Sequence, residues 1–105
     1  MAKIPVDFFT NYGMGLKDVG IISGMSYKYL NMPSNSYGIF VIIGYTDSMS
    51  MYMARAQNSG VTEYKAILQS EYIDLTPETN KIKITNNANG SIRILVASNV
   101  DFTLT

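Results

Sequence analysis

The stretch KIKITNNANGSIRILVAS, residues 81–98, carries the clearest secondary-structure signal in the chain. Apolar and polar side chains alternate in its first five residues, and Ile92, Ile94 and Val96 share one face of the second run, the pattern of strands that bury one face. Between them lies Asn89-Gly90, a pair that suits the positive backbone angles of a tight turn. The stretch predicts a β-hairpin, and the alternating residues 100–105, VDFTLT, extend the prediction to a three-stranded meander.

The segment SYGIFVIIGY, residues 36–45, is apolar on both faces of the strand that it predicts. Ile39, Val41 and Ile43 share one face, and Phe40 and Ile42 share the other. A strand that is apolar on both faces needs other residues to cover each of those faces.

The segment SMSMYMARAQ, residues 48–57, places Met49, Met51 and Met53 on one face of a predicted strand. Three interpretations are open for these methionines. Their flexible thioether side chains suit an irregular core, a subunit interface, or an exposed surface that accepts several partners. The two-sided apolar strand next to them favours the interface, because one small sandwich has only one natural core.

Residues 61–76, VTEYKAILQSEYIDLT, fit both a helical face and alternate strand positions. We favour two short strands, because the neighbouring segments all have β patterns and Thr76-Pro77 closes the segment as a turn. Shorter pieces near the N-terminus, IPVDFF and VGIIS, add to the series. Many short strands with frequent turns predict an all-β fold, an antiparallel β-sandwich or jelly-roll-like single domain over residues 1–105.

The composition narrows the range of functions. The chain has 105 residues and eight basic against eight acidic side chains, so nothing resembles the basic surface of a nucleic-acid-binding protein. Charged residues make up 15% of the chain, whereas roughly a quarter is usual for soluble domains. Part of the surface is therefore expected to be covered by another subunit.

The chain contains no cysteine and no histidine. Without them there is no Ser-His-Asp triad, no Cys-His pair and no ordinary zinc site. The eight carboxylates are scattered and show no spacing typical of a glycosidase pair. We expect a protein that is not an enzyme and needs no metal or cofactor.

The N-terminal sequence MAKIPVDFFTNYG lacks the basic stretch and long apolar run of a signal peptide. The longest apolar run, residues 38–44, is far shorter than the roughly 20 residues that span a bilayer. We therefore expect no membrane insertion.

The segment MSYKYLNMPSNSYG, residues 25–38, combines tyrosines with small polar side chains. Such mixtures serve binding loops, because tyrosine offers a flat apolar face and asparagine offers adaptable hydrogen bonds. The simpler interpretation is a strand followed by an ordinary turn. The candidate ligand-binding residues are Tyr27, Tyr29, Asn31, Asn35 and Tyr37.

In the order of its segments, the region 36–105 resembles the distal receptor-binding (tip) domain of bacteriophage tail fibre-like proteins. The segments that carry the resemblance are YGIFVIIGYTDSMSMYMARAQ, ILQSEYIDLT, KIKITNNANGSIRILVAS and the terminal VDFTLT. The resemblance implies a homotrimeric β-sandwich in the virion tail that binds a host surface glycan or protein without catalysis. It supplies no binding residues that could be placed on this sequence.

Two other classes of function stay open. One is a purely structural virion or assembly protein, whose surfaces contact only its own kind. The other is a cellular carbohydrate-binding module. A hydrolase fits the residues least well.

Overall fold

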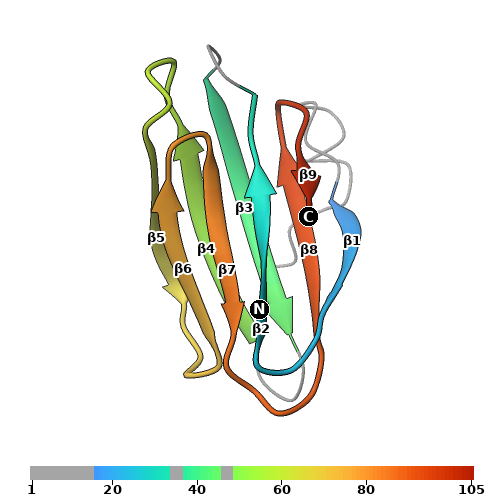
Figure 1. Ribbon diagram of the computed structural model, residues 1–105. Helices are drawn as coiled ribbons and strands as arrows, with labels where there is room; N and C mark the ends of the chain where they lie inside the picture. The colour runs from blue at the N-terminus through green and yellow to red at the C-terminus, as the bar shows by residue number, and fades with distance from the viewer. Residues whose placement is uncertain (1–15, 34–36, 46–48) are drawn as a thin grey trace.

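The structure is a computed structural model that describes residues 16–33, 37–45 and 49–105. All the regular secondary structure in these residues is β-strand (Figure 1). The strands are β1 (Lys17–Ile22), β2 (Ser26–Asn31), β3 (Gly38–Tyr45), β4 (Met49–Ala56), β5 (Thr62–Leu68), β6 (Ile73–Glu78), β7 (Lys81–Asn86), β8 (Ile92–Ser98) and β9 (Thr103–Leu104).

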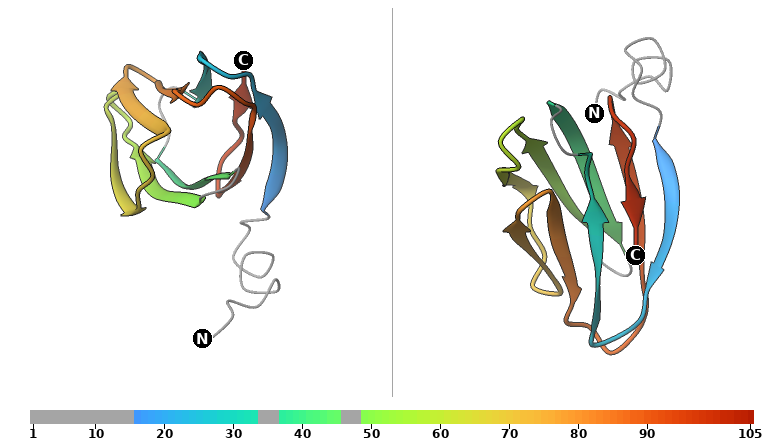
Figure 2. Two further views of the ribbon diagram at one scale, coloured as in Figure 1. Left: turned by 90° about the horizontal axis from the view of Figure 1, so that it is seen from below. Right: turned by 45° about the horizontal axis from the view of Figure 1, so that its top comes forward.

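The strands form two antiparallel sheets. One has five strands in the order β1-β8-β3-β4-β5, and the other has four in the order β6-β7-β2-β9. The sheets face each other around a shared interior, as the end-on view in Figure 2 shows. The predicted all-β sandwich is confirmed.

The core comes from alternate residues of both sheets. Phe40, Ile42 and Tyr52 point inward from the five-stranded sheet and meet Leu30 and Ile82 of the other. The hydroxyl of Tyr52 donates a hydrogen bond to the carbonyl of Ile73 at 3.0 Å, which satisfies the one polar atom of this ring. Burial raises the pKa of the Tyr52 hydroxyl, because the tyrosinate anion would lose its hydration there.

The predicted hairpin over 81–98 is wrong, although both of its strands exist. β7 pairs with β2 and β6, whereas β8 pairs with β1 and β3 in the other sheet. The connection between β7 and β8 is therefore a crossover between sheets. The meander is wrong as well, because β9 pairs with β2.

Two such crossovers lie side by side at one end of the sandwich, the lower end in Figure 1. The β1–β2 connection passes so close to the β7–β8 connection that a Cβ on Gly24 would overlap the carbonyl oxygen of Asn89. The N–H of Met25 donates to the carbonyl of Ala88 at 2.9 Å. Alternation along the sequence could not reveal the crossovers. A strand buries one face whether the chain after it turns back into the same sheet or crosses to the other sheet.

The ambiguous segment 61–76 forms strands β5 and β6, so the prediction of two strands is confirmed and the helical alternative is wrong. The predicted turn at Thr76-Pro77 is wrong, because both residues lie within β6 and pair with β7. β5 and β6 are edge strands of different sheets. The hydroxyl of Thr62 joins the sheets there by hydrogen bonds to the carbonyls of Glu78 at 2.6 Å and Lys81 at 3.1 Å.

The methionine row faces outward. Ser50, Tyr52 and Ala54 are buried in the interior, while Met49 and Met53 are 52% and 46% exposed. The core interpretation of this row is therefore wrong for Met49, Met51 and Met53, and the interior position belongs to Tyr52. β3 is apolar on both faces as predicted, with Phe40 and Ile42 inward.

Candidate functional site

The predicted ligand-binding residues fall in two separate places. Tyr27, Tyr29 and Asn31 share the outer face of β2 in the four-stranded sheet, as their spacing predicts. Tyr37 precedes β3 of the other sheet, and Asn35 lies outside the described residues. The structure does not bring Tyr37 into one site with the three residues of β2.

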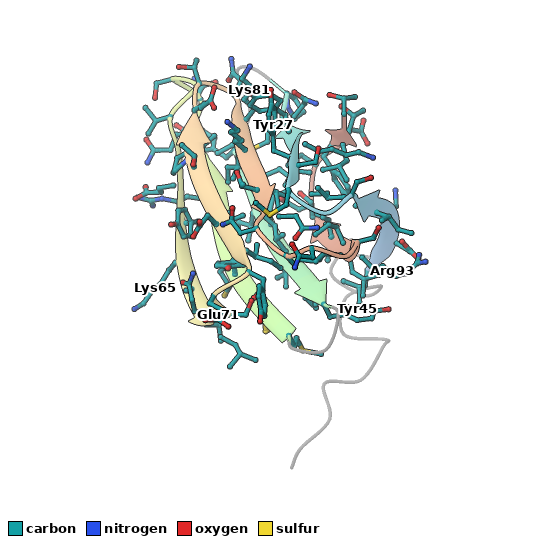
Figure 3. The ribbon with its side chains drawn as sticks, turned by 60° about the horizontal axis from the view of Figure 1, so that its bottom comes forward. Tyr27, Tyr45, Lys65, Glu71, Lys81 and Arg93 are labelled. Carbon is teal, nitrogen blue, oxygen red and sulfur yellow. The ribbon has the colours of Figure 1, made fainter. Side chains whose placement is uncertain are left out.

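On β2, the two tyrosine rings are already in contact with lysines. Tyr27 and Tyr29 meet edge to face with centroids 5.6 Å apart. The Nζ of Lys83 lies 4.1 Å from the Tyr27 centroid, and that of Lys81 lies 4.4 Å from the Tyr29 centroid. Figure 3 labels Tyr27 and Lys81 on this sheet. On the ring face that an ammonium group covers, a ligand would have to displace that group from a cation–π contact.

The side chain of Asn31 connects strand β2 to strand β9. Its amide nitrogen donates to the hydroxyl of Thr105 at 2.8 Å and to the hydroxyl of Thr103 at 3.3 Å. The N–H and carbonyl of Tyr29 also bond to Thr105. Asn31 therefore holds β9 against β2, since two ladder residues alone would bind such a short strand weakly.

Tyr37 lies at the opposite end of the sandwich from the two crossovers, beside a concave surface. Its side chain is 73% exposed. It borders a cavity of about 400 Å³ together with Ile39, Arg55, Gln57 and Asn99. This end is the upper one in Figure 1, where β3 and β5 begin and β4 and β8 end.

A second cavity of about 310 Å³ adjoins the first, because Ile39 and Arg55 line both. It continues over the outer face of β4 and β5 past Met53, Glu63 and Lys65. The two cavities form one groove, which we call the Tyr37 groove.

Planar polar side chains stand beside the tyrosine ring in this groove. Glu63 forms an ion pair with Arg55 and accepts a hydrogen bond from Gln57 at 3.3 Å. Asn99 accepts a hydrogen bond from the N–H of Ile39 at 2.8 Å, which engages its oxygen and leaves its NH₂ group as a donor. The groove thus offers an aromatic face, donors and acceptors within one concave surface.

Sequence reasoning found Tyr37 but missed Arg55, Gln57, Glu63 and Asn99. These residues come from three segments that no local pattern connects. Arg55 and Glu63 are direct cross-strand partners on β4 and β5, while Asn99 follows β8. Only the pairing of these strands brings the groove together.

Among the described residues that line the groove, one is a carboxylate, Glu63, and it is paired with Arg55. Asp18 and Glu78 are likewise in ion pairs, with Arg93 and Lys81. Within the described residues, no three acidic side chains gather into a group that could hold a metal ion. This part of the chain also contains no helix long and apolar enough to cross a membrane.

Neither the protein-family models nor the curated proteins contain a match to this chain. A solved structure does match: the tailspike protein gp49 from Acinetobacter baumannii bacteriophage Fri1, described as a capsular polysaccharide depolymerase. The TM-score is 0.61 at 9% sequence identity, over 88% of this chain and 19% of the tailspike chain. This chain therefore spans about a fifth of the tailspike's length, and the two share a fold found in a phage tail protein.

Proposed function

We propose that this chain is a non-catalytic binding domain of a phage tail protein, located in the virion tail, that holds a host surface polysaccharide in the Tyr37 groove. The observation that carries the proposal is the exposed Tyr37 ring beside the cavity of about 400 Å³. The fold shared with a tailspike supports the tail context.

The chemistry of the groove matches that of a sugar. A pyranose ring presents an apolar C–H face, which the flat face of Tyr37 can cover with little loss of side-chain entropy. Its hydroxyl groups are donors and acceptors at once. The guanidinium of Arg55 and the NH₂ group of Asn99 supply donors, while Glu63 supplies an acceptor.

Among the described residues that line the groove, Glu63 is not joined by a second carboxylate, and this favours binding without hydrolysis. Glycosidases of the common kind place two carboxyl groups about 5–9.5 Å apart across the scissile bond. The depolymerase activity belongs to the whole tailspike, of which the matched region is 19%.

A purely structural role in the virion is the second candidate. The observation that favours it is the apolar outer face of the five-stranded sheet, which suits contacts between subunits. In that case the Tyr37 groove would bind no saccharide.

The test is binding to an array of bacterial capsular and O-antigen polysaccharides, followed by titration with the strongest hit. Single sites are expected to be weak, roughly millimolar, and several copies would add avidity. Tyr37→Ala should weaken binding about tenfold without changing the melting temperature. Tyr27→Ala is the matched control, because Tyr27 is also exposed but lies on the other sheet.

Each outcome separates the candidates. Loss of binding in Tyr37→Ala alone supports the groove. Loss in Tyr27→Ala alone would move the site to the outer face of β2. If no polysaccharide binds the unaltered chain, the structural role takes precedence.

A further inference from the structure

Three asparagines lie close together where β7 ends and the crossover to β8 begins: Asn86, Asn87 and Asn89. The pair Asn89-Gly90 suits a tight hairpin turn, but this connection joins two different sheets. Neither residue of the pair has the positive φ angle of such a turn. The pair therefore does not serve as a hairpin turn in this fold.

The reaction open to an asparagine is deamidation. The backbone nitrogen of the following residue gives its proton to water or hydroxide and attacks the carbon of the side-chain amide. A carbon–nitrogen bond forms, a five-membered imide ring closes, and ammonia leaves. Water then opens the ring at either carbonyl, which yields aspartate or isoaspartate. No catalyst is needed, because the two reacting groups are held next to each other in one chain.

Asn86 and Asn87 are protected at both reacting groups. The Asn86 side chain is 1% exposed, and its amide nitrogen donates three hydrogen bonds. The nitrogen that would attack it, that of Asn87, donates to the carbonyl of Tyr72 at 2.8 Å. The Asn87 side chain donates to the carboxylate of Asp74 at 2.7 Å. The nitrogen that would attack Asn87, that of Ala88, donates to the Asn86 side chain at 2.8 Å.

Asn89 and Gly90 lack this protection. Both residues are exposed. The hydrogen bond between Gly90 and Asn86 uses the carbonyl of Gly90 and not its nitrogen. Within the described residues, neither the Asn89 side chain nor the N–H of Gly90 forms a hydrogen bond. Gly90 has no side chain to hinder the attack, and there is open space where a Cβ would lie.

We propose that Asn89 is a site of spontaneous modification, where attack by the Gly90 nitrogen converts the asparagine into aspartate and isoaspartate. Water is the co-reactant and ammonia is the product that leaves. The proposal does not depend on the saccharide site, because the Tyr37 groove lies at the opposite end of the sandwich (Figure 1).

The place of Asn89 in the fold makes the two products unequal. Aspartate leaves the backbone unchanged and adds a negative charge at an exposed position. Isoaspartate routes the chain through the former side chain and so inserts a methylene group into the backbone of the crossover. The Asn89 carbonyl packs so closely on the β1–β2 connection that a Cβ on Gly24 would overlap it. A longer backbone at this point distorts the contact between the crossovers, so isoaspartate should weaken the fold.

The first test is peptide mapping by mass spectrometry after incubation of the folded chain at mildly alkaline pH. Trypsin cleaves after Lys83 and Arg93, which places all three asparagines in the peptide 84–93. That peptide should change from the mass of an amide to that of an acid, with the change located at Asn89. The net charge of the chain should fall from 0 to −1, so ion-exchange chromatography separates the product.

Asn58 is the internal control, because it is also exposed but is followed by Ser59, whose Cβ hinders the attacking nitrogen. Gly90→Ala is the matched variant, since the new Cβ fits the fold and hinders the attack on Asn89 in the same way. Deamidation of Asn89 should slow on the order of tenfold in this variant. An unmodified Asn89, an equal rate in Gly90→Ala, or an equal rate at Asn58 in the unaltered chain would overturn the proposal.

Unfolding in urea tests the protection of the other two asparagines. Asn86 and Asn87 should stay unmodified in the folded chain and begin to react in urea, where their hydrogen bonds are lost. Reaction of either residue in the folded chain as fast as that of Asn89 would contradict the proposal.

The last measurement compares the two products. Asn89→Asp contains the aspartate product from the start and should melt at the temperature of the unaltered chain. The chromatographic fraction that carries isoaspartate should melt several degrees lower, because its backbone is longer where Gly24 packs on the crossover. Equal melting temperatures would overturn the inference that isoaspartate weakens the fold.

Discussion

Replacing Asn86 by alanine should destabilise the fold more than any change of a surface polar residue. The Asn86 side chain is 1% exposed and sits between the two crossovers. Its amide nitrogen donates to the carbonyls of Ile22 at 2.9 Å, Ser23 at 3.1 Å and Gly90 at 3.0 Å. Its oxygen accepts from the N–H of Ala88 at 2.8 Å. One side chain thus joins both connections between the sheets.

The cost follows from the groups that lose their partner. Leaving a buried donor or acceptor unsatisfied costs about 1–3 kcal/mol each. The hydrogen bond to Ile22 is buried and the other three are partly buried, so water can replace part of what is lost. We expect Asn86→Ala to lower the free energy of unfolding by about 3–5 kcal/mol. For a domain of this size that corresponds to a melting temperature lower by at least about 12 °C.

The assay is urea and thermal unfolding followed by circular dichroism. Asn89→Ala is the control, because Asn89 is exposed in the same connection. A loss below about 1 kcal/mol in Asn86→Ala, equal to that of the control, would refute the role of this side chain in joining the crossovers.

Asn86→Asp sharpens the test. A carboxylate of nearly the same shape has no donor and would face three carbonyl oxygens, so burial raises its pKa above that of the unfolded chain. Its protonated form then fits best, and the variant should gain stability relative to the unaltered chain as the pH falls through the raised pKa of the folded state towards about 3.9, the ordinary pKa of Asp in the unfolded chain.

The remaining predictions concern the core, a close contact and metal dependence. Tyr52→Phe should cost about 1 kcal/mol through its lost hydrogen bond to Ile73. Burial raises the pKa of Tyr52, so the tyrosine of the unfolded chain ionises first as the pH rises above about 10. The unaltered chain should therefore lose stability above that pH. In alkaline unfolding curves, the phenylalanine variant should lack this loss of stability. Gly24→Ala should lower the melting temperature because the new Cβ overlaps the carbonyl of Asn89, while Gly90→Ala, with open space at its Cβ, should be tolerated far better. EDTA should leave the melting temperature unchanged, and a fall would reveal a carboxylate metal site.

The sequence by itself determined the class of fold and the orientation of most strands. Alternation put Ile82 and Ile84 on the buried face of their strand, and the structure has both in the interior. It also placed Met51 and Tyr52 on opposite faces of one strand. This works because side chains alternate along any strand with a period of two, a local property of the backbone.

Where both faces of a strand were apolar, the sequence could not show which face lies in the interior. The core interpretation of the methionines was wrong for this reason. β3 and β4 had apolar residues on either side, and the choice depended on which face the second sheet covers. That choice is made by Tyr52, Phe40 and their partners in the four-stranded sheet, far away along the chain.

The pairing of strands, and with it the candidate site, was decided by the tertiary structure alone. The alternation in β7 and β8 was correct, yet each strand found its partners in a different sheet. Asn86 and Gly24 fix that separation through contacts with residues distant in sequence. The Tyr37 groove likewise joins the ends of strands that only the register brings together. Periodicity reports what one strand buries, whereas pairing depends on hydrogen bonds and packing between segments that are remote in sequence.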